Sequence, residues 1–443
     1  MNKYNFNDDV NKIYSFIDPR ILDSKLGIIK DIFRWVPEPD DPKLYVAAAI
    51  SSEVSMISGH EATRFNSGAG LTLKEACLSA VGESIERYAC TFINKNGLVK
   101  GTYKDLTNSG FNLANPTKFA FYHEKQYKQR KMPFKKFDKN ANINWTTAKS
   151  LTSNQNVYVP AACTYLPYYP DKDEDLIWFP ISTGLSCGKN LDEAILKGIY
   201  EVIERDAFSI MWFNKLSMPL IDFDSDEEIK KLIEERFNVP NCQLYMVDMT
   251  TEIGIPAVFG ILSENSHGLL VAASVRWTKK DAVKKTLMEL AQGRITWKKD
   301  FVKGIDKKYR EDYLDVKDFN DHVNLYTNYS MKDNAKFAYS SSQKVKLDEQ
   351  ITNKSNAEKI REIVNRLDNL GYEILVKDLT TSDVDKCGFK VVRVLIPGLT
   401  EISNDQEYLR LGGERIYSVP VKLGYRKRPL TYDELYRAPH PFP

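Results

Sequence analysis

Two distant stretches of the chain have nearly the same sequence, and this repeat limits the possible folds more than any other feature. Gly70 precedes LTLKEACLSAVGESIER and Gly188 precedes KNLDEAILKGIYEVIER, so the ending ExxER lies at the same distance from a glycine in both copies. A weaker third copy, AVKKTLMELAQGR, begins at Ala282. Apolar residues recur at helical spacing in each copy, so the repeat predicts three related helices.

The first two copies each end with two glutamates that are three residues apart. Residues with this spacing lie on one face of a helix, so Glu83 and Glu86 point the same way, as do Glu201 and Glu204. Four carboxylates brought together repel one another unless cations neutralise them, and oxygen ligands in pairs suit Mg²⁺. The spacing therefore indicates a magnesium site shared by two helices.

Arginines stand at the ends of all three copies, at Arg87, Arg205 and Arg294. Guanidinium groups donate in a fork that matches phosphate oxygens. Together with the carboxylates they indicate a nucleotide bound through magnesium, although the chain has no GxxxxGK[ST] loop. The alternative is a solvated, salt-bridged helix face. The repetition, and the apolar neighbours of Glu83 and Glu201, favour the binding site.

The composition excludes several other classes of protein. Lys and Arg total 62 against 60 Asp and Glu, which gives no reason to expect a nucleic acid or an anionic membrane as partner. No apolar run approaches the roughly 20 residues that span a bilayer, and the polar start does not resemble a signal peptide. We therefore expect a cytoplasmic protein. The six cysteines lack CxxC spacing and the five histidines lie far apart, which disfavours a His/Cys metal centre.

Helices and strands alternate along the chain without a sustained parallel βαβ rhythm, which predicts an α+β fold. Residues 1–59 are expected to form a helical N-terminal segment, in which Asp23 or Ser24 caps a helix that runs to Phe33. The Lys-rich residues 124–145 are predicted to be a solvated excursion.

The last third of the chain changes character twice. Residues 302–355 are charged and contain three consecutive serines, which predicts partial disorder. The next segment, 357–370, has apolar residues on one helical face and is followed by Gly371, a common helix stop. Residues 373–376 and 390–396 are predicted strands.

The repeated segments resemble the signature helices of the YcaO superfamily. NSGAGLTLKEACLSAVGESIERYAC and STGLSCGKNLDEAILKGIYEVIERDAF are similar to its first two helices, LMELAQGR to its third, and VVRVLIPGLTEIS to its late strand and Pro-Gly turn. The resemblance implies a YcaO domain over residues 60–443, with mixed or antiparallel sheets. It also implies an ATP site in which glutamates hold Mg²⁺.

The resemblance assigns roles position by position. It gives the metal to Glu83, Glu86, Glu201 and Glu204. It gives nucleotide contacts to Ser79, Ser186, Glu193, Arg205, Glu289, Gln292 and Arg294, and Ser24 is the candidate for an N-terminal phosphate contact. Ala69 stands where the family commonly has Lys, and Lys189 where Asn is frequent. These departures affect the contacts of two loops and leave the metal cluster intact.

The chain ends in Pro439-His440-Pro441-Phe442-Pro443. Alternating prolines fix φ and favour an extended, polyproline-like tail, which could equally be a floppy end or a ligand for an aromatic groove. Within the YcaO superfamily, a terminal PxPxP is similar to the ending of azoline-forming cyclodehydratases. That resemblance implies that the tail enters the active site, where the Pro443 carboxylate acts as a base.

The resemblance therefore predicts the cyclodehydratase (D) subunit of a thiazole/oxazole-modified microcin synthetase. Such an enzyme uses ATP and Mg²⁺ to convert Cys, or Ser and Thr, of a ribosomal precursor peptide into thiazoline or oxazoline. The expected partners are the precursor with its leader, a leader-binding scaffold similar to ubiquitin-activating enzymes, a flavin-dependent azoline dehydrogenase and a second copy of the chain. The alternatives are thioamide or amidine formation by another YcaO enzyme, and a non-catalytic ATP-binding interaction protein.

Overall fold

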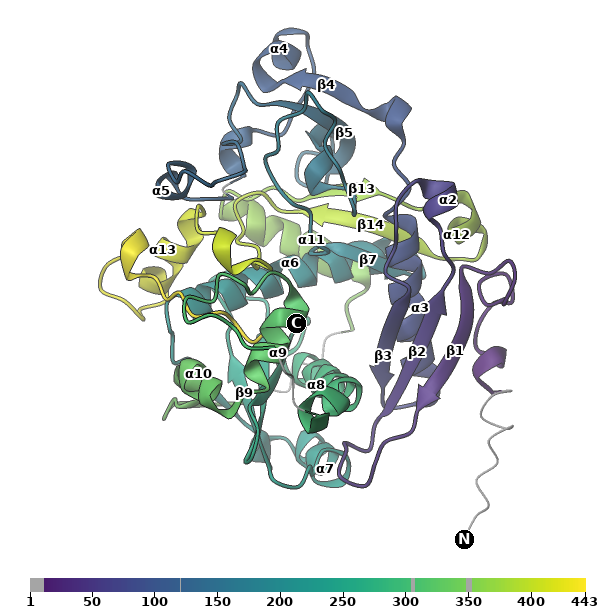
Figure 1. Ribbon diagram of the computed structural model, residues 1–443, viewed down its shortest axis with the longest axis vertical. Helices are drawn as coiled ribbons and strands as arrows, with labels where there is room; N and C mark the ends of the chain where they lie inside the picture. The colour runs from purple at the N-terminus through teal and green to yellow at the C-terminus, as the bar shows by residue number, and fades with distance from the viewer. Residues whose placement is uncertain (1–11, 120, 304–306, 348–352) are drawn as a thin grey trace.

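The computed structural model describes residues 12–119, 121–303, 307–347 and 353–443. These residues form three β-sheets, and each sheet carries one repeated helix (Figure 1). The repeated helices are α3 (Leu73–Ala89), α6 (Leu191–Phe213) and α8 (Lys279–Lys303). The predicted α+β class and the three helices of the repeat are confirmed.

The sheets are almost entirely antiparallel. The first has the order β1-β2-β3, from β1 (Ile29–Trp35), β2 (Tyr45–Ser51) and β3 (Phe65–Gly70). The second has the order β4-β5-β13-β14-β7 with β6 paired to β5, from β4 (Val99–Thr102), β5 (Asn142–Ser150), β6 (Asn156–Pro160), β7 (Leu185–Gly188), β13 (Leu375–Asp378) and β14 (Lys390–Leu395). The third has the order β11-β10-β9-β8-β12, from β8 (Leu220–Asp222), β9 (Cys242–Asp248), β10 (Ala257–Glu264), β11 (Leu269–Val275) and β12 (Lys344–Lys346), of which β8 and β12 are parallel.

The repeated helices are connected to the sheets in a cyclic order. Each helix comes directly after a strand: α3 after β3, α6 after β7, and α8 after β11. Each packs on its own sheet and also contacts the strand that precedes another repeated helix, since α3 contacts β7, α6 contacts β11 and α8 contacts β3. The third repeat thus closes on the first, and each helix lies between two sheets.

The glycines of the repeat allow the strands and helices to approach closely. A Cβ added at Gly70 would lie 2.5 Å from Cβ of Glu75, and one added at Gly188 would lie 2.5 Å from the backbone nitrogen of Ala194. Any side chain at either position would therefore push the strand end away from the first turn of its helix. This is the physical reason for the glycine that precedes both copies.

The N-terminal helix prediction is wrong. Residues Ile29–Trp35 form strand β1, and Oδ1 of Asp23 accepts the N–H groups of Lys25 and Leu26 in a turn before it. Strand β1 pairs with β2, which pairs with β3, so one sheet crosses the predicted boundary between residues 59 and 60. Residues 1–11 lie outside the described residues.

Two segments predicted to be solvated or disordered are packed instead. Between residues 124 and 145, Phe134 and Phe137 are buried. In the segment 302–355, Tyr326 is fully buried, and residues 304–306 and 348–352 lie outside the described part of the chain. This segment contributes β12, α9 (Phe319–Tyr326) and α10 (Lys332–Tyr339). The segment is rich in charged residues, but its aromatic residues supply the apolar area that packs against the rest of the protein.

The remaining helices are short or peripheral, except for the predicted helix after residue 355. That helix is α11 (Asn356–Asn369), and the strands predicted after it are β13 and β14. The others are α2 (Ser55–Ser58), α4 (Tyr103–Asn108), α5 (Glu124–Tyr127), α7 (Glu227–Arg236), α12 (Ser382–Lys386) and α13 (Glu414–Lys422). No helix within the described ranges is both long and apolar enough to cross a membrane.

Candidate active site

The repeat places the predicted metal-binding glutamates in equivalent positions. On α3, a carboxylate oxygen of Glu83 accepts the backbone N–H of Ser67 at 3.3 Å. On α6, a carboxylate oxygen of Glu201 accepts the backbone N–H of Gly184 at 3.1 Å. In both repeats the first glutamate is thus held by the backbone of the strand or turn before its helix.

The second glutamate of each pair lies deeper and carries a strongly shifted pKa. Burial, and then repulsion from Glu201 and Glu83, raise the pKa of Glu86 to about 8 against the attraction of Arg87. Burial, and then repulsion from Glu289 and Glu201, raise the pKa of Glu204 to about 8 against Arg205. The carboxylates of α3, α6 and α8 therefore form one electrostatically coupled cluster. Without cations, part of its charge must be neutralised by protons.

The arginines after the glutamates are only partly satisfied. The Nη1 atom of Arg87 lies 3.2 Å from Glu86, and Nε of Arg205 lies 3.6 Å from Glu204. Both Nε and Nη1 of Arg205 are buried and make no hydrogen bond with the described residues. Buried donors of this kind carry a desolvation cost unless a ligand accepts from them. Phosphate oxygens next to neutralised carboxylates would supply such acceptors.

The third repeat joins the site through α8. Gln292 stands where the other repeats have a glutamate, and its Nε2 donates to Oγ of Ser67 at 2.8 Å. The neighbouring Glu289 pairs with Lys285 at 3.2 Å. The Nε of Arg294 lies 3.1 Å from a carboxylate oxygen of Glu264. Gln292 thus supports the strand whose backbone holds Glu83.

Two of the predicted nucleotide contacts have local structural partners. Glu193 accepts the backbone N–H of Lys189 at 3.1 Å and pairs with Lys197 at 2.6 Å, so it stabilises the start of α6. Glu75 accepts backbone N–H groups in the same way at the start of α3. The buried Ser186 donates to the carbonyl of Ala194 at 2.7 Å. The repeat therefore preserves helix starts as well as the glutamate pairs.

Among the described residues, no hydrogen bond or ion pair joins the other two predicted contacts to the glutamate cluster. Ser79 is half-buried on α3, against the backbone of Gly68. Ser24 is exposed in the turn before β1, and no hydrogen bond or ion pair among the described residues joins it to the glutamates. A phosphate contact by Ser24 remains a prediction.

A separate group of carboxylates resembles a metal site but already has a cation. Among the described residues, Glu38, Asp40 and Asp41 bring ligand oxygens within 4.8 Å of one another, and no three of the predicted glutamates do so. The ammonium group of Lys298 lies 2.6, 2.5 and 3.2 Å from these three carboxylates. The predicted glutamates instead form two pairs on two helices. Paired oxygens with remaining positions for water and phosphate fit Mg²⁺.

The C-terminal tail is docked beside this cluster. The guanidinium carbon of Arg205 lies 4.2 Å from the ring centre of Phe442, which is buried. The His440 ring stacks on His322 at 3.9 Å, and its Nε2 donates to the carbonyl of Ser403 at 2.7 Å. The alternative of a floppy tail is therefore wrong. Pro443 directly follows the residue whose ring covers Arg205.

A second layer of charged residues, which the repeat does not predict, lies behind the glutamates. Arg393 on β14 is buried, and its charge lowers the pKa values of Glu86, Glu201 and Glu401 against the larger effect of burial, which raises them. Glu401 pairs with Arg410 at 2.8 Å. The motif VVRVLIPGLTE could have indicated this layer, because a charged residue inside an apolar strand needs a buried partner.

Two glutamate pairs beside partly satisfied arginines are a set of groups that fits a protein binding a nucleotide through Mg²⁺ without a phosphate loop. Residues 67–400 match the family model described as YcaO cyclodehydratase, ATP- and Mg²⁺-binding. The chain belongs to the YcaO family, which binds ATP and Mg²⁺. An uncharacterised protein of Methanothermobacter thermautotrophicus is 28% identical over 297 residues, which cover 63% of this chain and 71% of that protein.

Solved structures share the fold. A heterocyclase in complex with substrate and cofactor has a TM-score of 0.79 and 24% identity, covering 98% of this chain and 57% of its own. The heterocyclase TruD has a TM-score of 0.67 and 25% identity, covering 84% and 52%. The chain thus spans about half the length of these heterocyclases. YcaO from Methanopyrus kandleri, bound with AMPPCP and Mg²⁺, has a TM-score of 0.62 at 20% identity, covering 92% and 95%. A chain of the E. coli microcin synthetase McbBCD complex has 0.61 at 17%, covering 87% and 92%.

Proposed function

We propose that the chain is an ATP- and Mg²⁺-dependent peptide cyclodehydratase that forms thiazoline from Cys, with Ser and Thr as the alternative nucleophiles. The observation that carries the proposal is the docked PHPFP tail. Its Phe442 ring covers the guanidinium of Arg205, one turn from Glu201. A tail held at this point has its terminal carboxylate close to where ATP would bind, as an azoline-forming enzyme requires.

The proposed reaction uses the site for positioning and charge neutralisation. Glu83, Glu86, Glu201 and Glu204 would hold Mg²⁺, which when bound neutralises the phosphates of ATP. The nitrogens of Arg205 that make no hydrogen bond would donate to phosphate oxygens, and Arg294 would do so from α8.

The chemistry begins when the thiol attacks the preceding backbone carbonyl carbon. The resulting oxyanion takes the γ-phosphoryl group of ATP. Loss of phosphate and of the amide proton then leaves the ring with a C=N bond. The Pro443 carboxylate is the proposed base for one of the two protons that leave.

The proposed partners follow from the relatives. The two heterocyclases are longer than this chain, which covers 57% and 52% of their lengths, and one was solved with its substrate. The E. coli microcin synthetase is a complex of several proteins. These relatives support a separate scaffold that binds the leader of the precursor and raises its local concentration. A flavin-dependent dehydrogenase and a homodimer belong to the same proposal.

Product mass tests the proposal. The chain, Mg-ATP, and the scaffold and Cys-rich precursor encoded by neighbouring genes should yield a peptide lighter by one water for each ring. Glu201→Gln and Glu204→Gln should abolish this loss, because each removes a carboxylate of the metal pair. Glu235→Gln, at an exposed surface pair with Lys231, is the matched control and should keep the wild-type rate. A product carrying the mass change of a thioamide, in which sulfur replaces oxygen, would refute the cyclodehydratase assignment. Amidine formation also removes one water, so a loss of water that persists when every Cys, Ser and Thr of the precursor core is replaced by Ala would refute it as well.

A further inference from the structure

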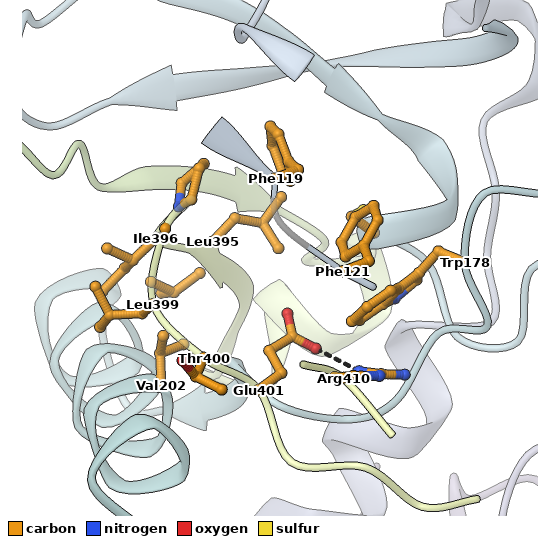
Figure 2. Close-up of a pocket in the computed structure, with 14 residues that line it drawn as sticks. Phe119, Phe121, Trp178, Val202, Leu395, Ile396, Leu399, Thr400, Glu401 and Arg410 are labelled. Atoms are coloured by element: carbon orange, nitrogen blue, oxygen red, sulfur yellow. Dashed lines mark hydrogen bonds and ion pairs between the residues drawn. The ribbon is translucent and has the colours of Figure 1, made fainter. Parts of the chain in front are cut away.

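A small pocket lies beside the glutamate cluster and has no role in the reaction described so far. It is enclosed between α6, the turn after β14 and the segment around Phe121, as Figure 2 shows. Val202, the residue after Glu201, forms part of its wall. The pocket therefore adjoins the part of α6 that carries a proposed metal ligand.

Most of the residues that line the pocket are apolar, and a carboxylate lies at its centre. Phe119, Phe121 and Trp178 line one side, and aliphatic residues that include Leu399 line the other (Figure 2). The Glu401 carboxylate points between these two sides (Figure 2). A carboxylate in such surroundings is costly unless it has a function or a partner.

Glu401 is held in place but keeps one oxygen free. Its Oε2 accepts from Arg410, which is itself fixed by stacking 3.3 Å over Trp178. Among the described residues, no hydrogen bond reaches Oε1. Burial raises the pKa of Glu401 against the attraction of Arg410 and Arg393, and Glu201 raises it further. These are the charged groups around it, and together they leave a carboxylate that accepts a proton more readily than usual.

The loop that carries Glu401 is anchored to α6. The backbone N–H of Thr400 donates to Oδ1 of Asp206 at 2.8 Å, and Oγ of Ser209 donates to the Glu401 carbonyl at 3.4 Å. Asp206 is in turn held by a buried pair with Arg415 at 2.7 Å. The position of Glu401 relative to the glutamates of α6 is therefore fixed by the fold.

The size of the pocket limits what can enter. Its free volume is about 30 Å³. One water-sized group needs roughly 10–15 Å³, so two or three such groups fit and an aromatic ring does not. The Cβ and Sγ atoms of cysteine are two such groups. Serine is of similar size, but burying its hydroxyl against apolar walls costs more, and its proton is much harder to remove than that of a thiol with a pKa near 8.5.

We propose that this pocket receives the side chain of the cysteine that is cyclised, and that Oε1 of Glu401 accepts its thiol proton. This inference rests on the proposed function. The sulfur electron pair forms the C–S bond with the preceding carbonyl carbon, the S–H proton passes to Glu401, and the carbonyl π electrons move to the oxygen that ATP then phosphorylates. The amide proton, which leaves in the later elimination, goes to the Pro443 carboxylate. Two bases thus serve two separate proton transfers.

Binding is tested without the natural precursor. Acetyl-Gly-Cys-Gly-amide is titrated calorimetrically into the whole chain with Mg²⁺ and a non-hydrolysable ATP analogue, beside the Ser and Phe peptides. The Cys peptide should bind saturably, the Ser peptide about tenfold more weakly, and the Phe peptide not measurably. Leu399→Phe, which fills the pocket, should weaken the Cys peptide at least tenfold while the affinity for the ATP analogue stays within twofold. Equal binding of all three peptides, no binding, or unchanged binding by Leu399→Phe would each overturn the pocket assignment.

Turnover tests the proton acceptor separately. Glu401→Gln keeps the shape and the hydrogen bond to Arg410 but cannot take a proton, so it should bind the Cys peptide within threefold of wild type and lose at least a hundredfold in ring formation. Wild-type rates in this variant would remove Glu401 from the chemistry. If the wild-type chain binds the peptide but forms no ring with its partners, the proposed function fails while the pocket stands. Thermal melting of both variants checks that they are folded, and the Ser-to-Cys ratio in wild type decides the pocket even if Leu399→Phe is unstable.

Discussion

Adding two glycines after Pro443 moves the terminal carboxylate and leaves the other groups of the tail unchanged. Each extended residue advances the chain by about 3.3 Å, so the carboxylate moves by roughly 6–7 Å. The hydrogen bonds that hold the tail lie upstream, because Trp212 donates to the carbonyl of Ala438 and Tyr326 to that of Pro439. The Phe442 ring over Arg205 is also retained. A shift of this size exceeds the reach of one hydrogen bond, about 3 Å.

The extended chain should therefore bind ATP within about twofold of wild type and lose most ring formation, by the 10²–10⁴ typical of a missing acid–base group. Calorimetry measures the nucleotide affinity and peptide mass measures the product. Phe442→Ala is the comparison, because it should disturb the tail, Arg205 and nucleotide binding together. An extended chain that forms azolines at the native rate would show that the chain end takes no part in the reaction.

Three further predictions concern stability. In the metal-free protein, burial and like charge raise the pKa of folded Glu86 from its ordinary 4.5 to about 8, so its contribution to stability is present below pH 4.5 and is lost as pH rises towards 8. Glu86→Gln should therefore raise the free energy of unfolding at pH 8, measured by urea titration, by about 1–3 kcal/mol. An unchanged free energy would contradict the coupling. Burial lowers the pKa of His322 to about 4 and that of His440 well below 6.5, so the contribution of these two residues to stability is present above pH 6.5 and is lost as pH falls through 4. Between pH 7 and pH 5, the melting temperature should fall less for His440→Phe than for wild type. Equal falls in melting temperature would exclude the stacked pair as the cause. Arg415→Met should lower the free energy of unfolding by about 3–5 kcal/mol, because it leaves Asp206 buried without its partner. Adding Asp206→Asn to Arg415→Met should recover part of the lost stability. A double variant no more stable than Arg415→Met alone would count against the pairing.

The repeat made the central elements of the fold predictable. Helices α3 and α6 are predictable because the glycine and the apolar spacing lie within one short stretch that occurs twice. Strand β1 was mistaken for a helix because Ile28, Ile29, Ile32 and Phe33 have helical spacing when considered alone. Its pairing with β2, which lies beyond three prolines, decides the matter, and that partner cannot be inferred from local periodicity.

The candidate site was predictable only where its residues belong to the repeat. The glutamate pairs lie on helices that the sequence itself aligns. Arg393 and Glu401 reach the same region from the other end of the chain, through β14 and the turn after it. Nothing in their local sequence states that the loop is tied to Asp206 on α6. Long-range hydrogen bonds of this kind bring candidate residues together into one site, and the local sequence does not reveal them.

The cyclic contacts of α3, α6 and α8 have a consequence for how the molecule comes apart. In an open array of repeats, an end unit touches one neighbour and can unfold first. Here α8 rests on β3, so neither the first nor the last repeat is an end. Unfolding of any one repeat exposes a surface of both others. A ligand bound by two repeats would therefore also stabilise the third against unfolding. Opening should therefore be concerted across segments more than two hundred residues apart, such as Ser67 and Gln292, which a hydrogen bond joins.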